Sequence, residues 1–148
     1  MDDAGTTGEV FRLIYRSRDL IPAQRHRAEL GELFTHARAK NKSLLVTGAL
    51  LVSEDRFVQT LEGEEDVVRA LLTRIEQDPR HDRVELLDAS LVSGRAFPRW
   101  SMAEVAEDGQ SDINLIAHQA GIARAASRGD TTSEQEGVLK VMRDAVRA

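Results

Sequence analysis

The segment RFVQTLEG, residues 56–63, places a primary amide where apolar side chains are expected. The segment alternates as a β-strand does, so Phe57, Gln59 and Leu61 fall on one face. A buried amide without hydrogen-bond partners destabilises a fold by roughly 1–3 kcal/mol. The chemistry that Gln59 offers is therefore hydrogen bonding, either to another side chain or to a ligand.

Tyr15, the only tyrosine of the chain, is the candidate partner of this amide. It shares a strand face with Phe11 and Leu13 in the alternating segment 10–17. The first and third strands are neighbours in a split βαβ sheet, so Tyr15 and Gln59 are expected to meet on one face. The pattern leaves two interpretations open, a structural pair in the core or a ligand site.

Two further pairs of residues are candidates for function. Trp100, the only tryptophan, and Met102 lie two residues apart on a short predicted strand, so their side chains point the same way. Arg80 and His81 directly follow a predicted helix. Each pair also has an ordinary interpretation, which is packing for the first and a solvated turn for the second.

Several chemistries find no support in the composition. The absence of cysteine removes disulfides, thiolate catalysis, zinc ribbons and iron–sulfur clusters. No metal-ligand pattern, phosphate loop or nucleophile elbow is present, and we expect His36 to be a surface or boundary residue of the first helix. The net charge of −5 disfavours general binding to nucleic acid.

The elements that must position these residues follow from the period of the apolar side chains. Strands are predicted at 10–17, 43–52, 56–63, 83–92 and 100–105. Helices are predicted at 24–40, between Gly63 and Pro79, at 113–126 and at 133–147. This order predicts an α+β fold, a ferredoxin-like split βαβ sandwich (βαββαββ) with two helices on one sheet face and C-terminal helices appended.

The chain of 148 residues is predicted to form one domain with an appendage. The expected divisions are a mobile N-terminal tail at 1–9, a domain at 10–106 and a C-terminal helical extension at 107–148. The apolar stripe of the last helix is expected to pack on the exposed sheet face or on a partner. The acidic N-terminus lacks a secretory signal and no apolar run reaches about 20 residues, so we expect a cytoplasmic protein without a membrane partner.

At this point the sequence resembles a known family, the BLUF domain, a blue-light sensor that uses FAD. The resemblance rests on the segments LIYRS, ARAKN, VTGALL with RFVQTLEG, RIEQDPRH and RAFPRWSM. Together these segments cover about residues 10–105 in the family's order and spacing. The combination of FVQTLEG with DPRH and FPRWSM in one short chain is highly specific.

The resemblance implies a role for each candidate residue. The flavin ring of FAD would lie between the two helices and against the sheet, with Gln59 bonded to the ring edge and Tyr15 bonded to Gln59. The residue that would hold the pyrimidine side of the ring is Asn41. The residues that would lie near the ribityl and phosphate groups are Asp78, Arg80, His81 and Lys40. The implied switch residues on the last strand are Trp100 and Met102.

The implied function is that of a photoreceptor and not of an enzyme. Light-driven transfer of an electron and a proton from Tyr15, followed by rearrangement of Gln59, would give a reversible red-shifted state. With no effector domain after residue 106, the signal is expected to leave by protein–protein contact through the helix at 133–147, and a homodimer is expected. The alternatives are a flavin-free or photochemically silent interaction module and a small acyl-phosphate hydrolase on the same scaffold.

One residue departs from the family's pattern. The family usually has glycine directly before the I/V-T-G step, and this sequence has Leu45 there. Glycine would permit a tight entry to the strand. We therefore expect Leu45 to push the loop after Asn41 outward and to loosen flavin binding.

Overall fold

The computed structural model describes residues 9–53, 55–98, 101–105, 113–118, 121–123 and 133–147. Its strands are β1 (Val10–Asp19), β2 (Thr47–Ser53), β3 (Arg56–Gly63), β4 (His81–Val92), β5 (Met102–Val105), β6 (Ile113–His118) and β7 (Gly121–Ala123). Its helices are the short 3₁₀ helix η1 (Ala23–Arg25), α1 (His26–Ser43), α2 (Glu65–Glu76) and α3 (Ser133–Arg147).

The described strands form one seven-stranded sheet in the order β4-β1-β3-β2-β5-β6-β7. Strand β1 is antiparallel to both β3 and β4, β2 and β3 form an antiparallel pair, and β5 is parallel to β2. The order β4-β1-β3-β2 is that of a ferredoxin-like split βαβ unit, so the predicted fold class is confirmed.

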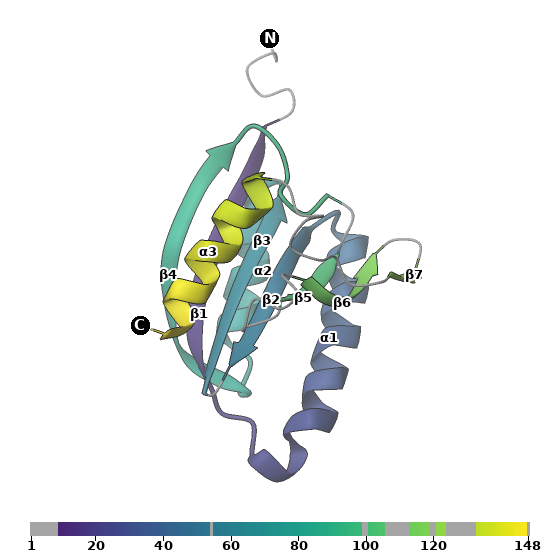
Figure 1. Ribbon diagram of the computed structural model, residues 1–148, viewed down its shortest axis with the longest axis vertical. Coiled ribbons are helices and arrows are strands. Elements are labelled where there is room, and N and C mark those ends of the chain that lie inside the picture. The colour runs from purple at the N-terminus through teal and green to yellow at the C-terminus, as the bar shows by residue number, and fades with distance from the viewer. Residues whose placement is uncertain are drawn as a thin grey trace.

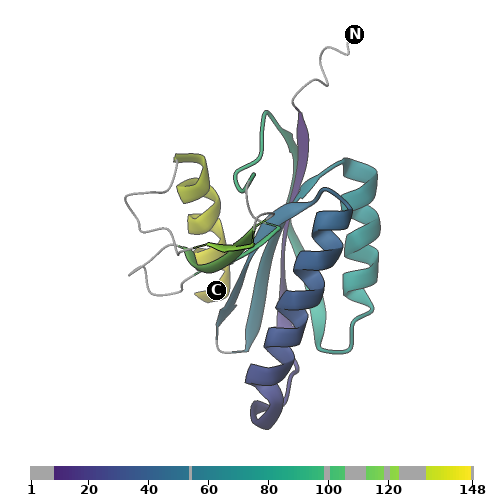
Figure 2. The same ribbon diagram turned by 90° about the vertical axis from the view of Figure 1, so that its right-hand side faces the viewer.

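Helices cover both faces of the sheet. Helices α1 and α2 lie on one face and α3 lies on the other, as Figures 1 and 2 show together. The apolar stripe of α3, which includes Val138, Leu139 and Met142, packs against Leu51 and Val58 of the sheet. The stripe therefore packs on a face of the sheet of its own chain, one of the two locations that the sequence predicted.

The prediction for residues 113–126 was wrong. A helix was expected there, and the structure has the strands β6 and β7 in place of it. The segment is rich in alanine, which favours a helix locally. In the fold, however, β6 pairs antiparallel with β5, with Met102 opposite Ala117, and this pairing satisfies the backbone of the β5 edge. Of the predicted C-terminal helices, only α3 is present among the described residues.

Gly48 and Leu45 have unusual backbone environments around the segment VTG, residues 46–48. An added Cβ at Gly48 of β2 would lie 2.0 Å from the carbonyl oxygen of Thr60 on β3, so only glycine fits. Leu45, between α1 and β2, has a left-handed φ of 59°, a region that favours glycine. Its side chain is 71% exposed, while Asn41 remains buried. A left-handed turn at Leu45 thus occurs together with an exposed Leu45 and a buried Asn41.

Candidate functional site

A cavity of about 540 Å³ lies between α1, α2 and the sheet. Its apolar walls come from α1, α2 and the sheet strands: Leu33, Ala37, Leu50, Phe57, Leu71 and Ile75. Its polar lining residues are Tyr15, His36, Lys40, Asn41, Gln59, Asp78, Arg80 and His81. The volume is in the range of small-molecule pockets, and the mixture of apolar walls with a few polar groups is typical of a ligand site.

Tyr15 and Gln59 form the polar centre of this cavity. They lie directly opposite each other in the antiparallel pair of β1 and β3, and both are buried. The Tyr15 hydroxyl donates a hydrogen bond to Gln59 Oε1. The contact that the strand pattern predicted is thus present, and it lines a cavity as well as stabilising a core pair.

The other end of the Gln59 amide points toward β5. Gln59 Nε2 donates to Met102 Sδ at 3.6 Å, and Met102 is buried. A thioether is a weak acceptor, so this contact restrains the amide much less than the Tyr15 hydroxyl does. Trp100, the other predicted switch residue, lies outside the described residues.

Asn41 reaches the cavity from the last turns of α1. Its side-chain Nδ2 donates to the carbonyl oxygen of Ser101 at 2.8 Å, and its backbone oxygen accepts from the Val46 amide at 2.8 Å. These two bonds tie the end of α1 to the residue before β5 and to the start of β2. Asn41 therefore links the cavity wall to the strand that carries Met102.

Asp78 and Arg80 lie at the end of the cavity near the start of β4. Arg80 Nη2 is 2.6 Å from Asp78 Oδ2, and both side chains are partly exposed. The hydrogen bond from Arg80 lowers the pKa of Asp78, and the same bond raises the pKa of Arg80. The pair places one fixed negative and one fixed positive charge at this end of the cavity.

His81 forms a rigid part of the cavity wall. Its Nδ1 is 2.7 Å from the Ser17 hydroxyl, and its Nε2 is 2.6 Å from the carbonyl oxygen of Ile75. Because Nε2 faces a carbonyl oxygen, it carries a proton and donates to Ile75. The imidazole ring meets Tyr15 edge-on at 6.2 Å between centroids, so His81 supports the phenol ring.

The sequence analysis identified Lys40 and Asn41 through the resemblance but missed three other lining residues on the same face of α1: Leu33, His36 and Ala37. Leu33, His36, Ala37, Lys40 and Asn41 follow the i, i+3, i+4, i+7, i+8 spacing of one helix face, and all five line the cavity. His36 and Lys40 are exposed, as was expected for His36. The spacing of these residues from Asn41 is the signal that could have identified them as lining residues.

Burial of Tyr15 raises the pKa of its phenol well above the ordinary value, and the Asp78 carboxylate raises it further. The phenol is therefore neutral at physiological pH and has its proton directed at Gln59.

The residues present fit a flavin. The apolar walls suit the two faces of a flat ring system, and the buried amides of Gln59 and Asn41 suit its polar edge. Within the described ranges, no group of three or more His, Cys, Asp or Glu side chains is placed to hold a metal ion. In the same part of the chain, no helix is long and apolar enough to cross a membrane.

Comparison with known proteins agrees with this geometry. Residues 10–103 match the family described as "BLUF: Sensors of blue-light using FAD". A photoactivated adenylate cyclase subunit alpha of Euglena gracilis is 33% identical over 122 residues, which are 81% of this chain and 12% of the relative. This chain therefore corresponds to a small part of that protein.

Solved structures give the same result. The dark state of BlrB, a BLUF protein, aligns with a TM-score of 0.63 and 34% identity, over 68% of this chain and 74% of BlrB. Klebsiella pneumoniae BlrP1 with FMN and cyclic diGMP aligns with a TM-score of 0.54 and 33% identity, over 65% of this chain and 25% of BlrP1. The fold and the matched residues define a member of a family of flavin-using blue-light sensors. The chain belongs to the BLUF family.

Proposed function

We propose that the chain is a blue-light photoreceptor in which Tyr15 and Gln59 perform the photochemistry beside a non-covalently bound FAD. The observation that carries the proposal is the buried Tyr15–Gln59 hydrogen bond at the wall of a cavity that fits a flavin ring. A bound flavin supplies the absorption of blue light and, once excited, an oxidant.

The residues of the chain then act in sequence. Tyr15 gives up an electron, and its hydroxyl proton moves along the existing hydrogen bond to Gln59 Oε1. Protonation turns the amide oxygen from an acceptor into a donor, and loss of a proton from the amide nitrogen would then turn that nitrogen into an acceptor, so the two ends would exchange roles. Return of the electron and a proton restores the phenol, and the chain is left with a changed hydrogen-bond pattern and no net reaction.

The changed amide would act on β5. In the starting arrangement Gln59 Nε2 faces Met102 Sδ, and exchange of the two roles would present an acceptor nitrogen to that sulfur. Two acceptors facing each other repel, so Met102 and β5 are biased toward another position. Trp100, two residues before Met102, is proposed as the second switch residue on the evidence of the resemblance alone.

The cofactor is proposed to be FAD rather than FMN. The family is described as using FAD, whereas a solved relative holds FMN. Lys40, at the exposed end of α1, and Arg80 provide cations at the cavity, which suit a diphosphate. Lys40→Gln should weaken FAD binding several-fold and leave riboflavin binding unchanged. An equal loss of affinity for FAD and for riboflavin would show that Lys40 does not bind the diphosphate.

The signal is proposed to pass to a protein partner, and the chain to act as a homodimer without catalytic turnover of its own. The adenylate cyclase relative is matched over only 12% of its length, so its named activity is not transferred to this chain. Capture of partners from a lysate in light and in darkness, with size-exclusion chromatography under both conditions, tests the partner and the dimer.

The decisive experiment is an absorption spectrum of the purified chain after addition of FAD. We expect a flavin spectrum that shifts to longer wavelength under blue light and recovers in darkness. Tyr15→Phe should bind flavin equally well and fail to complete this cycle. A chain that takes up no FAD would instead be a flavin-free interaction module, and a normal cycle in Tyr15→Phe would exclude the mechanism.

A further inference from the structure

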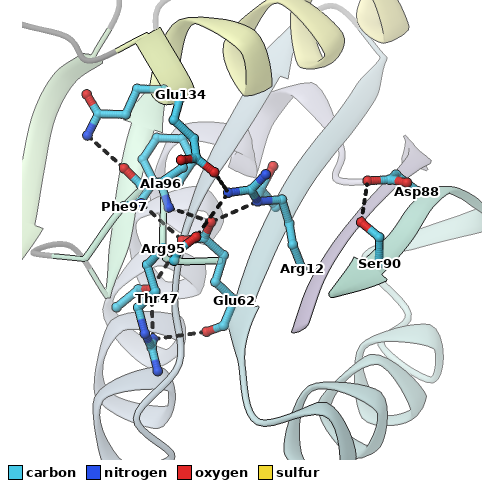
Figure 3. Close-up of polar contacts among 12 residues, drawn as sticks. Arg12, Thr47, Glu62, Asp88, Ser90, Arg95, Ala96, Phe97 and Glu134 are labelled. Atoms are coloured by element: carbon cyan, nitrogen blue, oxygen red, sulfur yellow. Dashed lines mark hydrogen bonds and ion pairs between the residues drawn. The ribbon is translucent and has the colours of Figure 1, made fainter. Parts of the chain in front are cut away.

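Glu62, the residue before the end of β3, is a charged side chain that is fully buried, with 0% exposure. Its carboxylate accepts from Arg12 Nε at 2.9 Å and from the backbone amides of Ala96 and Phe97 at 2.8 and 3.0 Å. Figure 3 shows these groups converging on the carboxylate. A buried carboxylate is stable only with such partners, so Glu62 fixes the position of the 96–97 backbone.

The same backbone segment is held from its other side by α3. Gln135 Nε2, in the first turn of α3, donates to the carbonyl oxygen of Ala96 at 2.8 Å, and Gln135 is buried. Arg12 also donates to Glu134 of the same turn at 2.7 Å. Residues 96–97, which follow β4, are thus held between the end of β3 and the start of α3.

Residues 96–97 precede the strand β5 in the sequence, and β5 carries the Met102 contact to the Gln59 amide. Phe97 is fully buried, and Met102, which contacts the Gln59 amide, follows five residues later. Arg95, directly before these residues, donates to the carbonyl oxygen of Leu45 at 2.8 Å, near the end of α1. Residues 95–97 therefore contact the loop after Asn41 on one side and α3 on the other.

Strand β3 provides a second connection between the two faces. Gln59 points toward the cavity, and its neighbour Thr60 points toward α3, where its hydroxyl donates to Met142 Sδ at 3.3 Å. Glu62 and Gln135 both hold residues 96–97. A displacement of β5 relative to β3 would therefore strain the contacts of these two residues with the 96–97 backbone.

We propose that Glu62 and Gln135 are positioning residues that couple the position of Met102 beside the Gln59 amide to the docking of the first turns of α3. The inference rests on the proposed photochemistry and specifies the contacts through which it reaches α3. When β5 moves in response to the Gln59 amide, the Ala96 carbonyl moves relative to Gln135, and the first turns of α3 lose protection. Linkage requires the reverse effect too, so the docking of α3 stabilises the dark position of Met102.

The test is amide hydrogen exchange of the full flavin-loaded chain, measured in darkness and under continuous blue light. In the wild type, light should lower the protection of the Ala96 and Phe97 amides and of the α3 amides at Val138 and Leu139 at least 3-fold. This measurement needs no variant, so it tests the proposal even where a substitution disturbs folding. A red shift with unchanged protection at all four amides would overturn the coupling and leave the photochemistry intact.

Gln135→Met removes the amide donor and keeps the length of the side chain. We expect the red shift to persist and the light-to-dark ratio of exchange at Val138 and Leu139 to fall to about one. The matched control is Lys140→Met on the exposed side of the same helix, which should keep the wild-type ratio. A wild-type ratio in Gln135→Met would overturn the role of Gln135. A wild type that shows no red shift would overturn the proposed function itself, and the coupling with it.

Discussion

The side-chain nitrogen of Gln59 lies 3.6 Å from the sulfur of Met102, while its oxygen accepts from Tyr15. One amide therefore connects the residue proposed as electron donor with the strand proposed to move. A side chain without distinct donor and acceptor ends cannot make this connection.

Replacement of Gln59 by leucine tests this arrangement directly. Gln59→Leu should still bind flavin, because leucine fills a similar volume, and it should lose the reversible red shift completely. The measurement is the light-minus-dark absorption spectrum of the purified variant. Gln77→Leu, at an exposed amide beyond α2, is the control and should keep the shift. A normal shift in Gln59→Leu would remove this residue from the mechanism.

The buried phenol predicts an unusual alkaline titration. Because burial raises the pKa of Tyr15, the native protein should show no phenolate absorbance at pH 10, the ordinary value for tyrosine. The folded state holds the phenolic proton more tightly than the unfolded state does, so stability falls as pH rises above about 10. Ultraviolet absorbance and circular dichroism should therefore change together, since Tyr15 is the only tyrosine. Phenolate formation in a still-folded chain would contradict the buried site.

The left-handed backbone at Leu45 predicts that glycine is favourable there. Leu45→Gly should stabilise the fold by roughly 0.5 kcal/mol, since relief of about 1–2 kcal/mol of steric cost exceeds the entropy that glycine loses. Leu20→Gly is the matched control, because Leu20 is also exposed but has no positive φ, and it should be destabilising. Denaturant unfolding measures both. Flavin affinity of Leu45→Gly tests the prediction that Leu45 loosens binding, which requires tighter binding in the variant.

The pair of Arg12 and Glu62 predicts a large loss of stability when the cation is removed. Arg12→Ala would leave a fully buried carboxylate without its counter-ion, which costs roughly 3–5 kcal/mol. Arg25→Ala removes an exposed pair with Glu29 and should cost less than about 1 kcal/mol. Urea unfolding of both variants gives the comparison. Similar losses of unfolding free energy in the two variants would show that the buried pair stabilises the fold no more than the exposed pair does.

The pair of Asp78 and Arg80 predicts a dependence of stability on acid pH. Since the Arg80 hydrogen bond lowers the pKa of Asp78, the folded state binds this proton less readily than the unfolded state. The stabilisation is therefore present above the ordinary value of 3.8 and is lost as pH falls through the lower folded pKa. The difference in unfolding free energy between wild type and Asp78→Asn should shrink below pH 4. A constant difference would exclude the linkage.

Local pattern was sufficient to pair Tyr15 with Gln59, although it left open whether the pair was structural or part of a ligand site. Alternation along residues 10–17 and 56–63 placed Tyr15 and Gln59 on inward faces, and the split βαβ order made their strands neighbours. These predictions held because side-chain direction in a strand has a period of two, which the sequence shows directly. The stripe of α3 was recognisable for the same kind of reason, since its apolar residues follow the helical period.

Tertiary structure alone decided two other features, the strand at residues 113–118 and the burial of Glu62. Residues 113–118 became a strand because β5 offers an edge whose hydrogen bonds outweigh local helix preference. Glu62 is charged and lies near the end of an ordinary strand, so nothing local marks it as buried; Arg12 of β1 and the backbone amides of Ala96 and Phe97 supply its partners. Period and propensity act between near neighbours and are encoded in the sequence, whereas burial of a charge depends on donors brought together from distant segments.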